Sequence, residues 1–300
     1  MMTIRELAND RYAVLKGLRE RTVHMINETI DRLEEFLERP ATLEDFTDLT
    51  MARFLRWRAT TPRKGRLASP ATVAKDKSHL SSLASLAARK RLIPEFIDFP
   101  RLKVPTRPPR GYTVEEVSAI IREARHCYGK VGPVPAAWLF MTLVRACWET
   151  GERVGGLLAV RWGEVDLERR VITVLGETRK DRTTTIERQI SGELAAWLTT
   201  QRRGDNCLVW PWLENRKQDS IYQILRKICD RSGVTPRGFH AIRKASGSYV
   251  KAGGGDATEH LGHASARTTQ KHYLDTRIVG QQSALDFLPP LDLTTKPKPK

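Results

Sequence analysis

Hydrophobic positions recur at helical spacing through the first ninety residues. Val23, Ile26, Ile30, Leu33 and Leu37 are separated alternately by three and four positions, so one face of a helix over 21–38 is apolar. Similar patterns predict helices over 49–59 and 71–90, with the loop "TTPRKGRLASP" between them. This part of the chain is therefore predicted to be all-helical.

The regular pattern ends at residues 93–113. The segment "IPEFIDFPRLKVPTRPPRGYT" contains five prolines and little periodicity, which is typical of an extended linker at a domain boundary. We therefore predict a helical domain over 1–100, a linker over 101–111 and a second domain over 112–288. Residues 289–300 have too few apolar side chains to fold, and we expect them to form a disordered basic tail.

The second domain combines helical and strand patterns. Thr113, with Glu116 three positions later, forms a capping-box signature before a helix. Apolar spacing predicts further helices over roughly 135–149, 191–202, 219–232 and 239–252, whereas 171–175 and 183–190 are short β-type runs. The expected fold is mainly α with a small antiparallel β-sheet, and the second domain is of mixed α/β type.

The charge of the chain indicates a binding partner. The chain has 51 Lys and Arg against 35 Asp and Glu, a net charge of +16, which predicts binding to nucleic acid. Between Asp48 and Asp76 no acidic residue occurs, and we predict that the cations of this stretch, here called the basic cluster, contact DNA. Its members are Arg53, Arg56, Arg58, Arg63, Lys64, Arg66 and Lys75. A solvated helix face followed by a flexible loop is the alternative interpretation.

Composition also excludes several classes of protein. No apolar run is long enough to span a membrane and the N-terminal segment lacks a signal-peptide core, so we expect no membrane partner and a cytoplasmic location. The four cysteines are widely spaced without a CxxC pair, and we expect buried thiols rather than disulfides or zinc ligands. They are Cys127, Cys147, Cys207 and Cys229.

Two stretches of the second domain carry candidate chemistry for a phosphodiester. In "FHAIR", His240 and Arg243 share a helix face, where the arginine can donate to phosphate oxygens and the histidine can move a proton. Arg153 follows a helix end in "TGER", and Lys180 lies in the polar turn between the two β-type runs. Each of these motifs occurs by chance in many proteins.

The stretch "EHLGHASARTTQKHYLD" holds three histidines and Tyr273. His260 and His263 are three positions apart, but zinc needs two further ligands and no cysteine lies nearby. We therefore expect no metal site and no cofactor. We assign no role to His260 or His272 beyond solvent exposure or local packing.

Taken in order, these motifs resemble the tyrosine recombinases, the phage integrase family. The matching segments are "TGERVGGLLAVRWGEVDL", a hairpin lysine in "TRKDRTTTI", then "HAIR", "LGH" and "TTQKHY". The resemblance covers about residues 111–280 and implies the family's mixed α/β catalytic domain. The helical first domain resembles the family's core-binding domain in layout only.

The resemblance implies that three residues contact the scissile phosphate. Arg153 and Arg243 match the two arginines that clamp the phosphate, and His263 matches the second histidine, which hydrogen-bonds it. An acidic residue often stands three positions after the first arginine in the family, where this chain has Gly156.

Three further residues are implied to move protons or to attack. Lys180 matches the hairpin lysine that protonates the leaving 5′ oxygen, His240 the general acid/base, and Tyr273 the nucleophile. Ten positions separate His263 from Tyr273, where nine is common. We expect Trp162 to lie in the core and Tyr249 to have a packing role.

The family's activity would be site-specific cleavage and rejoining of double-stranded DNA through a 3′-phosphotyrosyl intermediate, in integration, excision or resolution of mobile elements. The resemblance also implies a homotetramer on DNA, exchange of the C-terminal segment between protomers, and accessory directionality or DNA-bending proteins. Alternative functions are a DNA-relaxing type IB-like topoisomerase, a hairpin-forming resolvase, a non-catalytic DNA-binding protein of the same fold, and a metal-dependent nuclease.

Overall fold

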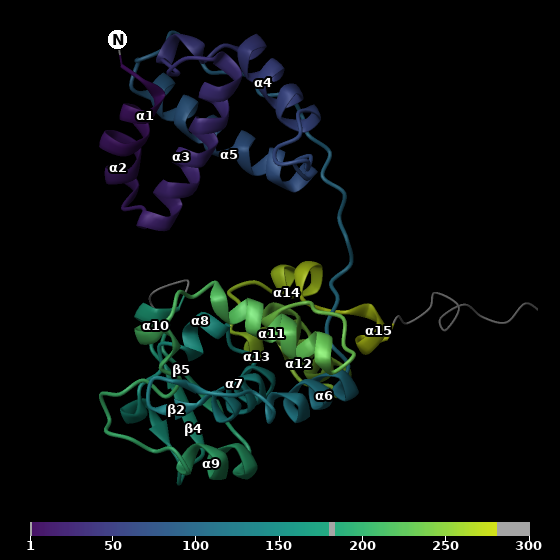
Figure 1. The fold of residues 1–300 in the computed structure, drawn as a ribbon. Coiled ribbons are helices and arrows are strands. Elements are labelled where there is room, and N and C mark those ends of the chain that lie inside the picture. The colour runs from purple at the N-terminus through teal and green to yellow at the C-terminus, as the bar shows by residue number, and fades with distance from the viewer. Residues whose placement is uncertain (1, 180–183, 281–300) are drawn as a thin grey trace, which may run out of the picture. The chain divides into compact units, whose positions relative to one another are not determined.

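The computed structural model describes residues 2–179 and 184–280, and the chain divides into two compact units, Met1–Arg107 and Pro108–Lys300 (Figure 1). Most described elements are helices, and the strands form two small antiparallel sheets. The predicted fold class is therefore confirmed. The predicted tail over 289–300 and Lys180, which was predicted to lie in the turn of a hairpin, are outside the described residues.

The N-terminal unit is helical throughout. It begins with a nearly continuous helical run of α1 (Ile4–Glu6), the π-helical η1 (Leu7–Ala13) and α2 (Val14–Lys16). The three predicted helices follow as α3 (Glu20–Leu37), α4 (Asp48–Thr60) and α5 (Pro70–Arg89), with the short 3₁₀ turn η2 (Leu43–Asp45) before α4. The run over Ile4–Lys16 was not predicted, because its apolar positions are too few to show a period.

Helices α3, α4 and α5 pack their apolar faces together. Ile30 and Leu33 of α3, Phe54 of α4 and Leu80 of α5 are fully buried in one cluster. Asp76 of α5 is also buried, and its carboxylate accepts hydrogen bonds from Arg58 Nε at 3.0 Å and from Thr29 Oγ1 at 3.1 Å. Arg58, a member of the basic cluster, is therefore held inside the unit by an ion pair.

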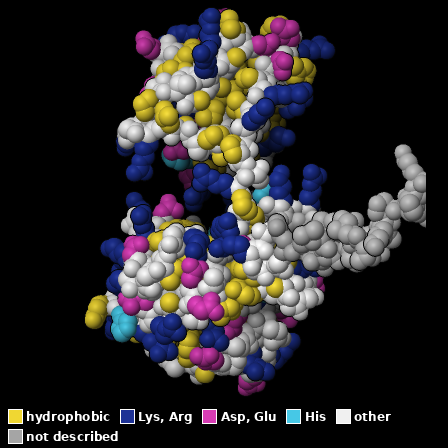
Figure 2. All heavy atoms as spheres, turned by 90° about the vertical axis from the view of Figure 1, so that its right-hand side faces the viewer, with side chains coloured by type: hydrophobic (Ala, Val, Ile, Leu, Met, Phe, Trp, Pro, Cys, Tyr) yellow, Lys and Arg dark blue, Asp and Glu magenta, His cyan; other side chains and the backbone are white. Residues whose placement is uncertain are grey.

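The rest of the basic cluster lies on α4, in the loop after it and, for Lys75, on α5. Arg53, Arg56, Arg63, Lys64 and Arg66 are exposed, whereas Lys75 is half-buried. The loop is an ordered turn, because the backbone groups of Arg63 and Arg66 bond each other in both directions, at 2.9 and 3.0 Å. Figure 2 shows Lys and Arg side chains in dark blue over the surface of both units.

The C-terminal unit places helices around a central one, α7 (Ala136–Thr150). The other elements, in chain order, are α6 (Val114–Ala124), β1 (Lys130–Val131), β2 (Val134–Pro135), α8 (Val154–Leu157), η3 (Trp162–Glu164), β3 (Val165–Asp166), β4 (Val171–Val174), η4 (Gly176–Thr178), β5 (Ile186–Gln189), α9 (Gly192–Thr199), α10 (Trp212–Asn215), α11 (Ser220–Arg231), α12 (Phe239–Ala252), α13 (Ala257–Leu261), α14 (Ala266–His272) and α15 (Thr276–Val279). Thr113 caps α6 as predicted, with both bonds of the capping box present.

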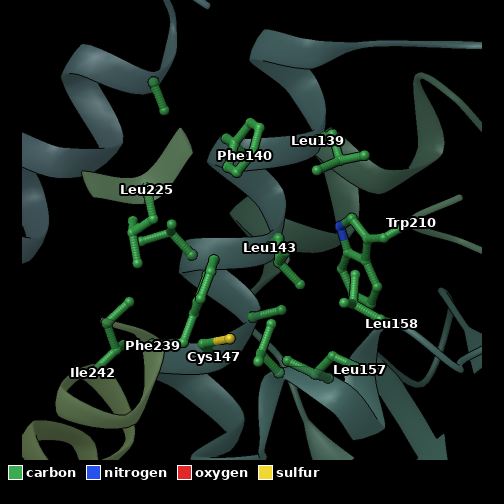
Figure 3. Packing of buried hydrophobic residues seen from close by; sticks show 14 of the residues in the cluster. Leu139, Phe140, Leu143, Cys147, Leu157, Leu158, Trp210, Leu225, Phe239 and Ile242 are labelled. Carbon is green, nitrogen blue, oxygen red and sulfur yellow. The ribbon is translucent and has the colours of Figure 1, made fainter. Parts of the chain in front are cut away.

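Helix α7 is the axis of the core. Leu139, Phe140 and Leu143 of this helix pack with Leu225 of α11 and Phe239 of α12 (Figure 3). All five side chains are at most 2% exposed. The same packing fixes the C-terminal end of α7 against α12, and the candidate catalytic residues lie at this junction.

Strands β3, β4 and β5 form an antiparallel sheet in that order. Val171 pairs with Gln189 and Val174 with Ile186, so β4 and β5 pair as the sequence predicted, and position 180 falls between them in the sequence. The two-residue strands β1, β2 and β3 were not predicted, since two residues carry no alternation to detect.

Candidate active site

The end of α7 requires a glycine. Gly151 ends the helix with a φ of 61°, and a Cβ atom there would lie 2.6 Å from His260 Nε2. The turn directs the Gly151 carbonyl toward α12, where it accepts a hydrogen bond from Arg243 Nη1. Arg153, two residues later, caps α8. The glycine of "TG" thus bonds Arg243 through its carbonyl and lies two residues before Arg153.

Arg243 is buried in the middle of the site. Its side chain is 1% exposed, donates from Nη2 to the Leu261 carbonyl at 2.6 Å, and lies 3.0 Å from His263 Nε2. Burial, followed by the nearby charge of Arg153, lowers the pKa of Arg243 to about 10. The guanidinium therefore remains charged at neutral pH and is held rigidly by carbonyl oxygens of two loops.

Tyr273 lies against Arg243 and both predicted histidines. Its ring centroid is 4.2 Å from that of His263, 5.0 Å from that of His240, and 5.4 Å from Arg243 Cζ. Tyr273 follows α14 directly and is 7% exposed. These four side chains, here called the Tyr273 cluster, come from α12, the loop between α13 and α14, and the residue that follows α14.

Both histidines of the cluster are held neutral. Surrounding protein, then the charges of Lys244, Arg243 and Arg153, lowers the pKa of His240 to about 4, although its side chain reaches solvent. Burial and then the charges of Arg243 and Arg153 lower the pKa of His263 to about 4 as well. At neutral pH each ring therefore offers one donor and one acceptor.

Two buried residues, Thr269 and Asp275, fix the segment that carries Tyr273 through hydrogen bonds. Thr269 Oγ1 lies 2.9 Å from His263 Nδ1. Asp275, which is fully buried, accepts a hydrogen bond from the Gly111 backbone N–H at 2.9 Å. Although burial acts in the opposite direction, hydrogen bonds from Arg277 and from backbone N–H groups lower the pKa of Asp275 to about 2. Thr269 stands in the "TTQKHY" segment but was given no role from the sequence, and Asp275 was not singled out because an aspartate in a helical region carries no motif of its own.

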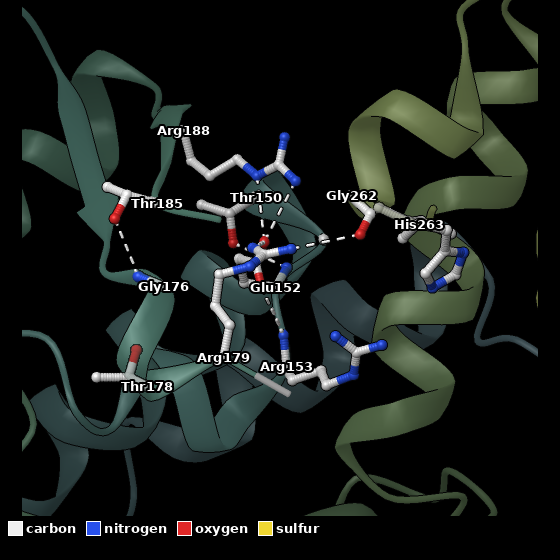
Figure 4. Close-up of polar contacts among 12 residues, drawn as sticks. Thr150, Glu152, Arg153, Gly176, Thr178, Arg179, Thr185, Arg188, Gly262 and His263 are labelled. Atoms are coloured by element: carbon white, nitrogen blue, oxygen red, sulfur yellow. Dashed lines mark hydrogen bonds and ion pairs between the residues drawn. The ribbon is translucent and has the colours of Figure 1, made fainter. Parts of the chain in front are cut away.

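Glu152 is a further buried residue that the sequence did not identify. It is 2% exposed, and its Oε1 accepts from Arg179 Nη1 at 2.5 Å and from Arg188 Nη2 at 3.2 Å (Figure 4). Its Oε2 lies 3.9 Å from Arg243 Nη1 and accepts from the Arg153 backbone N–H at 3.3 Å. The only sign in the sequence was that Glu152 directly precedes Arg153. That position indicates no function until the fold shows which side chains surround it.

The structure brings together five of the six predicted catalytic positions. His240, Arg243, His263 and Tyr273 form one cluster, and the charge of Arg153 acts on three of them. Lys180 lies outside the described residues, although Arg179 directly before it is buried against Glu152. The basic cluster belongs to the other unit.

The two unassigned histidines differ in their surroundings. His260 is partly buried and its Nε2 lies 2.7 Å from Ser246 Oγ, so its packing is local. His272 is exposed. Among the described residues, no group of three or more His, Cys, Asp or Glu is placed to hold a metal ion.

Other expected core residues are mostly in place. Trp162 is fully buried, and Tyr249 packs against Trp148. Cys147 and Cys229 are buried and Cys127 is half-buried, but Cys207 is exposed because it lies in the surface turn between α9 and α10. No helix of the described chain combines the length and the apolar character needed to cross a membrane.

Comparison with known proteins places the chain in a family. The sequence model of the phage integrase family matches residues 112–278. Tyrosine recombinase XerD of Mycobacterium leprae is 27% identical over 185 residues, which cover 57% of this chain and 58% of that protein. Tyrosine recombinase XerC of Corynebacterium efficiens is 25% identical over 239 residues, which cover 77% of this chain and 75% of that protein.

Two solved structures have a similar fold. A lambda integrase dimer bound to a COC′ core site aligns with a TM-score of 0.67 and 18% identity, over 98% of this chain and 81% of that one. The Tn1549 transposon integrase in complex with transposon right end DNA aligns with a TM-score of 0.67 and 15% identity, over 95% and 97%.

The chain belongs to the phage integrase family, because the family's sequence model covers more than half of its length. These are the tyrosine recombinases, a class of site-specific DNA recombinases.

Proposed function

We propose that this protein cleaves and rejoins DNA at specific sites through a 3′-phosphotyrosyl intermediate on Tyr273. The observation that carries the proposal is the Tyr273 cluster: a tyrosine in contact with a buried arginine and two neutral histidines. Packing alone does not account for a cation this deeply buried beside a tyrosine, because burying charge is costly.

The chemistry needs a nucleophile, a charge clamp and a general acid. The Tyr273 oxygen attacks phosphorus, the 5′ oxygen leaves, and the phosphodiester bond is conserved as a phosphotyrosyl ester. Arg153 and Arg243 would stabilise the charge that develops on the non-bridging oxygens. His240 would accept the tyrosine proton, and Lys180 would protonate the leaving oxygen. A free 5′ hydroxyl reverses these steps on the same or another strand.

The partner is proposed to be double-stranded DNA, met in the cytoplasm. The net charge of +16 and the exposed members of the basic cluster support this. A lambda integrase tetramer bound to a Holliday junction has a similar fold. We propose a homotetramer on DNA for this chain too, assisted by directionality or DNA-bending proteins.

A nicked "suicide" DNA substrate tests the proposal, because loss of the short strand traps the covalent adduct. Wild-type protein is expected to form an adduct that is stable to denaturant, and Tyr273→Phe none. Tyr249→Phe is the matched control, since Tyr249 lies on α12 but packs against Trp148. An adduct formed by Tyr273→Phe would refute the proposal, as would its absence from the wild type.

Further assays separate the alternatives. A metal-dependent nuclease would lose activity with a chelator, whereas we expect none to be lost. A type IB-like topoisomerase would relax supercoiled DNA that lacks a specific site, and a hairpin-forming resolvase would join the two strands of one end. A non-catalytic binding protein would bind DNA without forming an adduct.

A further inference from the structure

We propose that Glu152 is a positioning residue for this reaction, and that it supplies the carboxylate which position 156 does not. The proposal rests on the proposed function. Glu152 does not touch the Tyr273 ring in any described contact; it acts through three arginines that come from three different elements.

The first observation is where those arginines lie. Arg179 follows η4 and immediately precedes Lys180, Arg188 lies on β5, and Arg243 lies on α12. Their distances to the Glu152 carboxylate are 2.5, 3.2 and 3.9 Å. One carboxylate thus holds the base of the hairpin, the sheet and the phosphate-clamping helix in register.

The same arginines extend the connection to His263. Arg179 Nη2 donates to the Gly262 carbonyl, and Arg188 Nη1 donates to the Glu259 carbonyl, both at 3.4 Å. Gly262 directly precedes His263. Displacement of either guanidinium would therefore move the loop that presents this histidine to the Tyr273 cluster.

The second observation is electrostatic. Burial alone would raise the pKa of the Glu152 carboxyl, but the charges of Arg243, Arg179 and Arg188 lower it. The carboxylate is therefore ionised at neutral pH. Without it, Arg179 and Arg188 would lose the carboxylate that they share, and their charges, which repel each other, would be less well compensated.

The third observation concerns Gly156, which is buried in α8. A Cβ atom at this position would lie 4.0 Å from Glu152 Oε2 and 3.3 Å from Val174 Cγ1. A side chain at 156 therefore points toward the space that the Glu152 carboxylate occupies. The proposal requires that a carboxylate at either position can reach the arginines, and two carboxylates there would repel each other.

Moving the carboxylate tests the inference. We would compare Glu152→Ala with two double variants, Glu152→Ala/Gly156→Glu and Glu152→Ala/Gly156→Gln. The two doubles have the same shape and differ only in charge. The measurements are the rate of adduct formation on the nicked DNA, the Kd for intact DNA, and the melting temperature without DNA.

We expect Glu152→Ala to slow adduct formation by about 10- to 100-fold, the range seen when partners that orient site ligands are removed, with little change in Kd. The Gly156→Glu double should recover most of the rate and melt at a higher temperature than the Gly156→Gln double. If Glu152→Ala alone does not fold, the comparison of the two doubles decides.

A normal rate in Glu152→Ala would overturn the positioning role. Equal rates or equal melting temperatures in the two doubles would overturn the claim that a carboxylate at position 156 can replace Glu152. Failure of the Gly156→Glu double to fold would overturn it too. Failure of the proposed function is distinguished by the wild type, which would then form no adduct, while the melting temperatures would still test that claim.

Discussion

Arg243 Nη2 lies 3.0 Å from His263 Nε2, and a guanidinium can only donate. His263 must therefore accept at Nε2 and carry its proton on Nδ1, from which it donates to Thr269 Oγ1 at 2.9 Å. Arg243 thus sets the tautomer of a histidine that contacts the candidate nucleophile, and Thr269 supplies the acceptor for its Nδ1 proton.

Replacing Thr269 by valine should slow adduct formation, because the Nδ1–H would be buried without an acceptor and the ring would turn. We expect a decrease of about 10-fold, corresponding to roughly 1.4 kcal/mol, with unchanged DNA affinity. Thr268→Val is the matched control, since Thr268 is exposed. Equal rates in the two variants would show that Thr269 does not orient His263.

Arg243→Lys should abolish most activity although it keeps the charge. A lysine cannot donate to the carbonyls of Gly151 and Leu261 while still facing His263. We expect adduct formation to fall by about 100-fold or more, the usual cost of losing a preorganised donor at developing charge. Single-turnover kinetics on the nicked substrate would measure this, and activity within a few-fold of wild type would contradict the assignment.

Stability should decrease between pH 7 and pH 5 because of buried neutral histidines. The pKa of His260 is about 4 in the folded chain, lowered by burial and then by Arg188 and Arg243, against an ordinary value of 6.5. The unfolded chain therefore binds more protons in this interval, and protonation favours unfolding as the pH falls.

The expected share of His260 is about 1 kcal/mol, after allowance for its partial exposure. Urea unfolding at the two pH values would measure it, and His260→Gln should show a shallower dependence by that amount. His24→Gln, at an exposed position, should match the wild type. An unchanged dependence in His260→Gln would disprove this explanation.

The basic cluster should divide into DNA-contacting and structural members. Arg56 is exposed, whereas the side chain of Arg58 is 14% exposed and bonded to buried Asp76. Arg56→Ala should reduce the slope of log Kd against log salt by about 0.9, as for one lost phosphate contact. Arg58→Ala should instead destabilise the protein by about 2 kcal/mol, because the buried Asp76 carboxylate would lose its charged hydrogen-bond donor and keep only Thr29 at 3.1 Å and Lys75 at 3.8 Å.

Salt titrations of DNA binding, together with urea unfolding, would separate the two effects. If Arg56→Ala leaves the salt slope unchanged, Arg56 makes no phosphate contact. If Arg58→Ala is as stable as wild type, the ion pair with Asp76 contributes nothing to the fold.

The sequence predicted the long helices and the order of the site residues, but not what supports them. Periodic apolar residues and the Thr113–Glu116 capping box are local signals, and the helices they predict are present within one to three residues. Glu152 and Thr269 lie inside the "TGER" and "TTQKHY" motifs, but nothing local gives either of them a role, since they act through partners 27 and 6 positions away. A glycine at 156 was visible in the sequence, whereas the carboxylate beside it could be recognised only once α8, β4 and β5 were packed together.

The bond between Gly111 and Asp275 joins two distant parts of the C-terminal unit. Gly111 ends the predicted linker, and Asp275 stands two residues beyond Tyr273. The backbone at Gly111 packs closely against α12, because a Cβ atom on Gly111 would lie 2.9 Å from Ala245 Cα. A pull on the linker would therefore act on the segment that carries Tyr273. The segments around Gly111 and Asp275 must then move together, or the hydrogen bond between them must break.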